Sequence, residues 1–518
     1  MSVDAILDER GHDAPASKAN RGLITASVMV ATTMNSLDTT IANVALPHMA
    51  GSVSASADQI TWVLTSYIVA AAIMTPMTGW LAGRFGRKRV FLFSIIGFTI
   101  ASMACGAAQS LGQIVAFRLL QGMFGAALVP LSQAVLMDTY PPEEQGPAMA
   151  IWSMGAVLGP IIGPALGGFL TDNFSWRWVF YINLPFGILA ALGVFTFIKD
   201  HRHAIKIPFD FLGFMLLSAG IGSFQLFLDR GDDRAWFESS EIWIEAVVAG
   251  LAIALFAFHT MTAKRPFLPR ELLKDRNFIS ATVFGFFFGL LLFSALALLP
   301  PMLEVLMGYP VVTTGLITAP RGLGSLVSMI IVGRLIGRVD ARLIILAGLL
   351  LTAVAVWGMS QFSLQMDSSL ILWTGVVSGM GTGMMFVPLT TLAFATLKPA
   401  LRADGAGVFT LVRNLGSSAG ISILQALHTR NTEVVHSTLV ERLRPDNPLA
   451  QAPFLRLPFS LTDPTGAALL NGEVNRQASM VAYVDDFHLM FVVALVLAPV
   501  LLLMRPPRGN NDVQIIAD

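Results

Sequence analysis

Residues 37–47, Leu37-Asp-Thr-Thr-Ile-Ala-Asn-Val-Ala-Leu-Pro47, place an aspartate, Asp38, inside the first long apolar segment of the chain. A second charge, Arg118, lies in a later apolar segment, within Ala116-Phe-Arg-Leu-Leu-Gln-Gly122. A charge at bilayer depth costs at least about 2.5–3.5 kcal/mol, so charged residues there usually face a polar cavity and have a function. The two residues therefore predict a membrane protein that moves something across the bilayer.

The composition is that of a protein with many membrane spans. Of the 518 residues, 54% are hydrophobic and 13% are charged, whereas about 25% are charged in a typical soluble domain. The formal net charge of +0 gives no indication of a nucleic-acid partner. The single cysteine, Cys105, excludes an internal disulfide and a cysteine metal site. We expect no bound metal and no catalytic residues.

Apolar runs of about 20 residues, enough to cross a hydrocarbon layer about 30 Å thick, predict fourteen membrane-spanning helices. Within residues 277–336, Pro300-Pro301 and Gly308-Tyr-Pro310 divide two of these spans. Most lysines and arginines lie in alternate loops, which predicts by the positive-inside rule that both termini are cytoplasmic. The expected fold class is an all-α membrane protein.

The two halves of the chain resemble each other at short motifs. Gly79-Trp-Leu-Ala-Gly83-Arg84 is similar to Gly333-Arg-Leu-Ile-Gly337-Arg338, and a second pair begins at Gly125 and Gly383. Chance matches between glycine-rich helices are the alternative. Repeated halves are typical of transporters, whose sites lie near the bilayer midplane where the halves meet. The predicted parts are a cytoplasmic tail (1–21), a six-helix bundle (22–200), an inserted helix pair (201–276), a second six-helix bundle (277–505) with a long outer loop (428–486), and a cytoplasmic tail (506–518).

Several motifs occur in the order typical of a known family. They are Leu37–Pro47, Gly79-Trp-Leu-Ala-Gly-Arg-Phe-Gly86-Arg87-Lys88, Arg118–Gly125, Gly155–Gly168, Trp176–Gly187 and Leu228–Gly231. Over residues 20–505 the chain thereby resembles the major facilitator superfamily, and within it the fourteen-helix drug–proton antiporters of the EmrB/QacA type. The resemblance implies two six-helix bundles with an inserted helix pair, and proton-coupled export. One departure is Gly83, which stands where the family has an acid.

Asp38 and Arg118 are the predicted proton-coupling residues. A carboxyl group can bind and release a proton, whereas an arginine does not lose its proton in proteins. We therefore expect Asp38 to carry the proton and Arg118 to set the conditions for it. The alternatives are a structural acid hydrogen-bonded to Thr39 or Asn43, and a structural interhelical bond of Arg118. The sequence does not decide whether the two side chains touch.

A second set of residues is predicted to control conformation. Gly155, Gly159 and Gly163 recur every four residues on one helix face and permit close helix packing. Pro160 and Pro164 remove backbone donors from the same helix. The pattern predicts a bendable gating helix, with tight packing as the alternative. The motif residues Gly79, Arg84, Gly86 and Arg87 are assigned to the same role, with simple inside-positive topology as the alternative.

The expected substrate cavity combines polar and adaptable side chains, because such side chains suit promiscuous apolar ligands. The residues are Asn43, Gln121, Met123, Arg321, Met384 and Phe386. For any single one of these residues, packing or contact with lipid is the alternative.

The predicted function is proton-coupled export of small hydrophobic or cationic compounds by alternating access, as expected of a multidrug efflux antiporter in the inner membrane. The proton motive force is the only driving factor expected, and no enzyme activity is predicted. In a Gram-negative organism, the resemblance implies a membrane-fusion adaptor and an outer-membrane channel as partners. The alternatives are an exporter or importer specific for one metabolite, and a membrane sensor or intramembrane enzyme that transports nothing.

Overall fold

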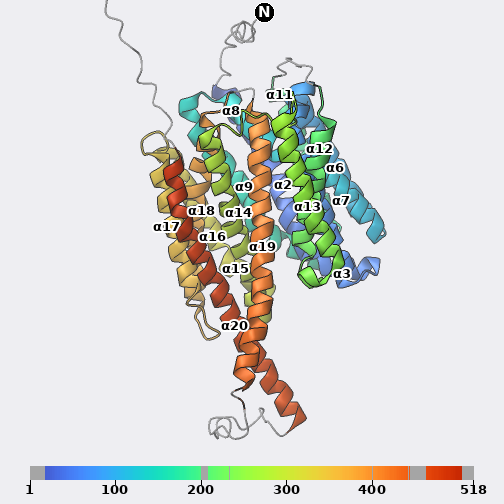
Figure 1. Ribbon diagram of the computed structural model, residues 1–518, viewed down its shortest axis with the longest axis vertical. Coiled ribbons are helices and arrows are strands. Elements are labelled where there is room, and N and C mark those ends of the chain that lie inside the picture. The colour runs from blue at the N-terminus through green and yellow to red at the C-terminus, as the bar shows by residue number, and fades with distance from the viewer. Residues whose placement is uncertain are drawn as a thin grey trace, which may run out of the picture. The chain divides into compact units, whose positions relative to one another are not determined.

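The structure is a computed structural model that describes residues 18–199, 208–232, 234–398, 401–441, 443 and 463–504 (Figure 1). Regular secondary structure in these residues is helical. Most of the predicted tails, residues 200–207 at the start of the predicted helix pair and residues 444–462 of the predicted outer loop lie outside the described residues. The chain forms two compact units, which we describe separately.

The described residues of the first unit lie within Met1–Asp210, Val332–Val339 and Leu397–Val408. Its helices are α2 (Lys18–Val53), α3 (Ala57–Ile60), α4 (Trp62–Met74), α5 (Met77–Phe85), α6 (Arg87–Ala107), α7 (Leu111–Gly125), α8 (Leu128–Thr139), α9 (Pro142–Asn173), α10 (Trp178–Tyr181) and α11 (Asn183–Phe197). α2 packs along α9 and α11, and α7 packs against α4 and α6. Large apolar side chains such as Trp152, Phe98 and Phe180 fill the space between the helices.

The described residues of the second unit lie within Phe211–Ile331, Asp340–Thr396 and Phe409–Asp518. Its helices are α12 (Phe211–Arg230), α13 (Ser240–Thr262), α14 (Arg276–Pro301), α15 (Val311–Thr318), α17 (Ala341–Met359), α18 (Ser368–Ala395) and α20 (Pro464–Leu497), with most of α16 (Pro320–Leu335) and α19 (Arg402–Glu441). Shorter turns are η1 (Trp236–Glu238), η2 (Met302–Leu306) and η5 (Ala498–Leu503). α12 lies beside α13 (Figure 1), and α17 packs along α18 and α20.

The helices confirm a multi-span membrane protein but not the predicted number of spans. The described residues contain eleven helical spans that are long and apolar enough to cross a membrane. α4 and α5 meet at a 57° bend, and counting this pair as one further span gives twelve. The predicted division near Gly308 is confirmed, because one span ends at Leu306 and the next begins at Thr313. α2 and α19, 36 and 40 residues long, are not among the eleven, because polar side chains lower their mean hydropathy.

The predicted long outer loop (428–486) differs from the structure at both ends. α19 continues as a helix to Glu441, and α20 begins at Pro464. The Asp463 side chain accepts a hydrogen bond from the Gly466 amide at 2.8 Å, which satisfies a free donor at the start of α20. These segments are polar, and their polarity indicated a loop. Polarity alone does not prevent a helix, because a helix forms its backbone hydrogen bonds within itself.

Candidate functional site

Asp38 and Arg118 form a buried ion pair in the first unit. Asp38 comes from α2 and Arg118 from α7, and neither side chain is exposed to solvent. The Arg118 Nη1 atom donates to Asp38 Oδ2 at 2.6 Å. The contact that the sequence left open is therefore made. A charged pair this deeply buried needs further hydrogen bonds to offset the loss of water.

Two amides supply those hydrogen bonds to the carboxylate. Gln121 Nε2 and Asn183 Nδ2 each donate to Asp38 Oδ1 at 2.8 Å. Gln121 follows Arg118 by three residues on α7, so both side chains lie on one face of that helix. Asn183 is the first residue of α11, and its Nδ2 atom also donates to Ser102 Oγ at 2.9 Å. The carboxylate thus accepts three hydrogen bonds from side chains on two other helices.

The Arg118 guanidinium is held in place on several sides. Its Nε atom donates to the Val63 carbonyl at 3.1 Å, and Nη1 also donates to Gln121 Oε1 at 2.8 Å. Its Cζ atom lies 4.6 Å from the ring centroid of Tyr67, a favourable arrangement for a cation on an aromatic face. Asn183 and Tyr67 were not among the predicted site residues. Their signal in the sequence was a polar group within an apolar run.

The predicted glycine face of α9 packs against α2. An added Cβ atom at Gly159 would lie 2.5 Å from the backbone carbon of Ser36, and one at Gly163 would lie 3.0 Å from Thr40 Cβ. α9 continues unbroken through Pro160 and Pro164. The gating role of these residues stays a prediction.

The prolines of α9 leave backbone carbonyls without their helical donors. Pro160 has no N–H for the carbonyl of Ala156, four residues earlier. Ser36 Oγ donates to this carbonyl at 2.8 Å. Thr33 and Thr40 donate to the neighbouring carbonyls of Gly155 and Gly159 at 3.0 and 3.2 Å. Hydroxyl groups of α2 therefore stabilise the proline-containing segment of α9.

The predicted conformational motif surrounds the turn between α5 and α6. Gly86 has a φ of 90°, a conformation that favours glycine. Arg87 forms an ion pair with Asp138 at the end of α8. Arg402, in the first turn of α19, reaches the same carboxylate at 3.5 Å. Among the described residues, no ion pair of Arg84 is found.

Asp404, which the sequence analysis missed, lies against the same motif. An added Cβ atom at Gly79 would lie 2.8 Å from Asp404 Cα, so only glycine allows this approach. By contrast, an added Cβ at Gly83 would meet nothing within 4 Å. Burial raises the pKa of Asp404 to about 7, although attraction to Arg87 lowers it. The motif thus has a carboxyl group beside it, contributed by α19 and not by position 83.

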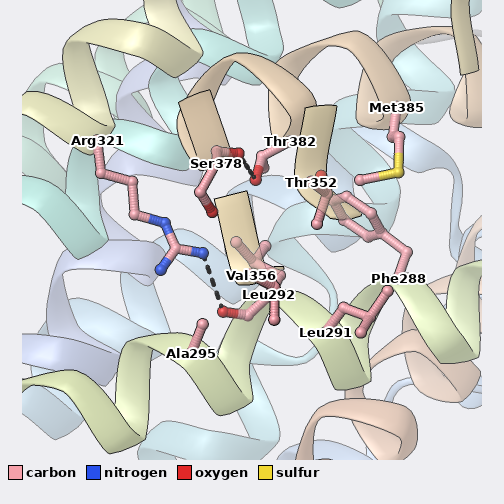
Figure 2. A pocket seen from close by; sticks show the side chains of 10 residues that line it. All are labelled: Phe288, Leu291, Leu292, Ala295, Arg321, Thr352, Val356, Ser378, Thr382 and Met385. Carbon is pink, nitrogen blue, oxygen red and sulfur yellow. Dashed lines mark hydrogen bonds between the residues drawn. The ribbon is translucent and has the colours of Figure 1, made fainter. Parts of the chain in front are cut away.

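A small cavity of about 10 Å³, room for about one water molecule, lies among α14, α16, α17 and α18 of the second unit (Figure 2). Arg321, predicted to line a cavity, points into it and is 7% exposed. Phe386 does not line the cavity but stacks on Phe288, which does. Met385 lines it in place of the neighbouring Met384.

The other predicted cavity residues lie in the first unit. Gln121 belongs to the Asp38 cluster. Asn43 and Met123 are exposed, and the Met123 side chain is 43% accessible. The six predicted residues therefore do not form one site within either unit.

A second buried acid was also missed, because its segment was assigned to the outer loop. The Oδ2 atom of Asp486 on α20 lies 3.1 Å from Nδ1 of His428 on α19. The Asp486 side chain is 1% exposed. His428 Nε2 lies 3.2 Å from Ser479 Oγ. Within the residues described, no group of three or more histidine, cysteine, aspartate or glutamate side chains is arranged to hold a metal.

Comparison with known proteins places these features in a family. A family model described as Major Facilitator Superfamily matches residues 28–421. The multidrug export protein EmrB of Escherichia coli (strain K12) is 35% identical over 498 residues, which cover 96% of this chain and 97% of that protein. The fatty acid resistance protein FarB of Neisseria gonorrhoeae is 34% identical over 95% of this chain and 98% of its own length. The solved structure of the proton:xylose symporter XylE has a TM-score of 0.60 at 12% identity, covering 92% of this chain and 95% of that one, a likeness in fold alone.

Proposed function

The chain belongs to the major facilitator superfamily and is a multidrug efflux transporter, and on this premise we propose that Asp38 couples export to the movement of protons. The multidrug exporters it resembles match it along nearly their whole length, so the chain is a transporter and not an enzyme. The proposed substrates are small hydrophobic or cationic compounds. The proposed driving force is the proton motive force, without another cofactor.

The main support for the proton role is that the buried Asp38 carboxylate is fully hydrogen-bonded to Arg118, Gln121 and Asn183. The carboxylate is fully buried and accepts three hydrogen bonds, one of them from a guanidinium. Proton binding to Asp38 would remove the charge that holds Arg118 in place. Because Arg118 keeps its own charge, it would then need another partner. Protonation and the arrangement of α2, α7 and α11 are therefore energetically linked.

The proposed transport cycle follows from that linkage. Asp38 releases its proton to the cytoplasm when substrate binds, and it takes up a proton from outside when substrate leaves. The two six-helix bundles (22–200 and 277–505) rock against each other, so that the substrate site opens alternately to the two sides of the membrane. The glycine face of α9 and the motif at Gly79, Gly86 and Arg87 are the proposed moving contacts.

The proposed topology has fourteen spans with both termini in the cytoplasm, in the inner membrane of the cell. The eleven apolar spans support this number when three more are added, namely α2, α19 and the bent pair α4–α5, each counted as one span. In a Gram-negative cell, a membrane-fusion adaptor and an outer-membrane channel would complete the export path. Homology to multidrug export proteins supports the transport of small molecules by this chain.

Everted membrane vesicles test the proton role. Energised vesicles that contain the native protein should release protons when an exported compound is added, whereas vesicles with Asp38→Asn should release none. Asp172→Asn is a matched control, because Asp172 is an exposed carboxylate on α9. Full coupling in Asp38→Asn would contradict the proposal. A broad compound panel that releases no protons through the native protein would contradict proton-driven export.

A further inference from the structure

Asp486 and His428 form a second buried contact that involves an acid, far along the chain from Asp38. Asp486 Oδ2 lies 3.1 Å from His428 Nδ1, and their side chains are 1% and 12% exposed. The contact joins α20 to α19 within the second unit. An ionisable residue inside a membrane-spanning helix usually has a function, and this pair has no part in the transport cycle proposed above.

The burial of Asp486 requires a proton at this contact. Its Oδ1 atom is buried without a hydrogen-bond partner among the described residues, and a buried carboxylate without a cation is strongly unfavourable. Two arrangements avoid that charge: an imidazolium beside a carboxylate, and a neutral imidazole beside a carboxylic acid. Both hold one proton more than a neutral imidazole beside a carboxylate. The pair as a whole therefore binds one proton.

The surroundings of His428 suit the imidazolium form. An imidazolium donates from both ring nitrogens, and the two nitrogens face two acceptors, because Nε2 lies 3.2 Å from Ser479 Oγ. The ring centroid of Tyr483 lies 4.1 Å from that of His428, and an aromatic ring stabilises a cation beside it.

Other charged groups near the pair do not replace that proton. Those nearest in sequence on the same two helices are exposed, namely Arg430, Glu433, Asp485 and His488. Those on the other elements packed against α19 and α20 are Asp229 and Arg230 of α12, Arg276 of α14, Arg342 of α17 and Glu304 of η2. Arg230 pairs with Glu241, and Arg276 and Arg342 donate to the carbonyls of Leu503 and Met504. In the described part of the chain, His428 is the one group in ion-pair contact with Asp486.

A second histidine contact between the same helices needs no additional proton. His436 lies about two turns beyond His428, and its Nε2 atom is 2.9 Å from Asn471 Oδ1. A neutral imidazole with its hydrogen on Nε2 donates to this oxygen as an imidazolium does. A dependence of the α19–α20 contact on protons is therefore expected at His428 and not at His436.

The buried pair lies far from the arginine-bearing end of α20. Asp486 is about 25–30 Å along the helix from Leu503, close to the full thickness of a hydrocarbon layer of about 30 Å. α19 and α20 continue past the pair, as far as Glu441 and Pro464 (Figure 1). In the proposed topology the arginines are cytoplasmic, so the pair lies near the outer surface.

We propose that His428 and Asp486 form a second proton-binding site, which keeps the outer parts of α19 and α20 joined while it carries its proton. When His428 gives its proton to water, the Asp486 charge is relieved only by contact with water, and the two helices separate. The proposal goes beyond the role of Asp38. It rests on the proposed topology only in placing the site on the outer side, where the proton motive force supplies protons.

The separation of the two helices can be measured with nitroxide spin labels. Val440→Cys on α19 and Leu469→Cys on α20 provide exposed labelling sites, whereas the native Cys105 is buried. Distances would be measured by double electron–electron resonance in phosphatidylcholine nanodiscs from about pH 5 to about pH 9, a range that includes the charge change of histidine. The native protein should give one short distance in acid and longer, broader distances at alkaline pH.

Variants of the pair should respond in opposite directions. His428→Gln should separate at a pH about two units lower than the native protein, because an aspartic acid in water holds its proton roughly 400-fold more weakly than an imidazolium. Asp486→Asn should stay joined at alkaline pH, because no charge is then buried. The double variant should stay joined over the whole range. Asp485→Asn and His436→Gln are controls and should behave as the native protein does.

Nuclear magnetic resonance of ¹⁵N-labelled histidine rings tests the proton itself, with His428→Gln identifying the signal. A charge-assisted hydrogen bond corresponds to about 10- to 100-fold in affinity. His428 should therefore hold its proton at least about tenfold more tightly in the native protein than in Asp486→Asn. Asp485→Asn should change this affinity by less than about threefold, as exposed charges do.

Three outcomes would overturn the proposal. They are a native distance that does not change with pH, the same pH dependence in Asp486→Asn as in the native protein, and a proton affinity of His428 that is equal in these two proteins. Both measurements are made at equilibrium without a proton gradient, and Asp38→Asn should leave them unchanged. Failure of Asp38 coupling in vesicles would leave this site intact, so the two proposals fail separately.

Discussion

The buried pair of Asp38 and Arg118 allows a quantitative prediction. In Asp38→Asn, the side-chain oxygen can still accept from Gln121 and Asn183, but the new amide nitrogen then faces Arg118 Nη1, a donor, across the present 2.6 Å contact. The guanidinium is left buried without a counterion. Removing one partner of a buried pair costs about 3–5 kcal/mol. We expect Asp38→Asn to lower the free energy of unfolding by this amount.

Removing both charges should be less harmful than the sum of the two single changes. Arg118→Gln alone leaves a buried carboxylate, whereas Asp38→Asn with Arg118→Gln leaves two neutral amides that can hydrogen-bond each other. The double-mutant cycle should therefore give a coupling energy of at least about 2 kcal/mol. Reversible unfolding of the purified protein in mixed micelles with increasing denaturing detergent measures the four free energies.

The same cycle can refute the reasoning. If the two single losses simply add in the double variant, the two side chains do not act as a pair. If Asp38→Asn lowers the free energy of unfolding by less than about 1 kcal/mol, the acid is not held as the distances indicate. A matched change at the exposed Asp172 should lower it by less than about 0.5 kcal/mol, as surface substitutions usually do.

Three further outcomes are expected. Gly159→Ala should destabilise the protein by about 1–3 kcal/mol in the same unfolding assay, because the added Cβ atom would overlap α2. Gly168→Ala is the control and should not destabilise the protein, because its added Cβ atom would lie 3.9 Å from its nearest neighbour, a side-chain carbon of Val44. Asp404 has a pKa of about 7 in the folded protein and about 3.9 in the unfolded chain. The free energy of unfolding should therefore fall as pH rises from about 4 to 7 and level off above that range. Thermal unfolding of Asp404→Asn across pH should not show this decrease. Arg118→Lys should lose coupled transport in vesicles although it keeps the positive charge. Lysine lacks the Nε donor that binds the Val63 carbonyl at 3.1 Å.

The sequence predicted the Asp38–Arg118 site better than it predicted the cavity. A charge within an apolar run is visible in one dimension because its cost in a membrane requires a reason. Gln121 was assigned to the substrate cavity, although it follows Arg118 by three residues on α7 and donates to the same carboxylate. The third donor, Asn183, lies 145 positions from Asp38, and only the packing of α11 on α2 brings it near.

The cavity residues show the opposite case. Arg321 was recognised because it is charged, but Met384 was chosen where its neighbour Met385 lines the cavity. Along an apolar helix, nothing in the sequence states which face meets a cavity and which meets protein or lipid. Asp404 was missed for a related reason, since its partner Gly79 lies far away in the sequence and the contact exists only because glycine has no side chain.

The hydroxyl groups of α2 that bind α9 oppose a rotation of α2 that would expose Asp38. Ser36 and Thr40 each lie two residues from Asp38, a rotation of about 200° around an α-helix, so they occupy the opposite face. Turning α2 to expose its carboxylate would break their hydrogen bonds to α9, at a cost of about 1 kcal/mol each. If Asp38 carries the proton, as proposed, these hydrogen bonds favour a proton path that opens between α2 and α7 or α11, with α2 and α9 moving together.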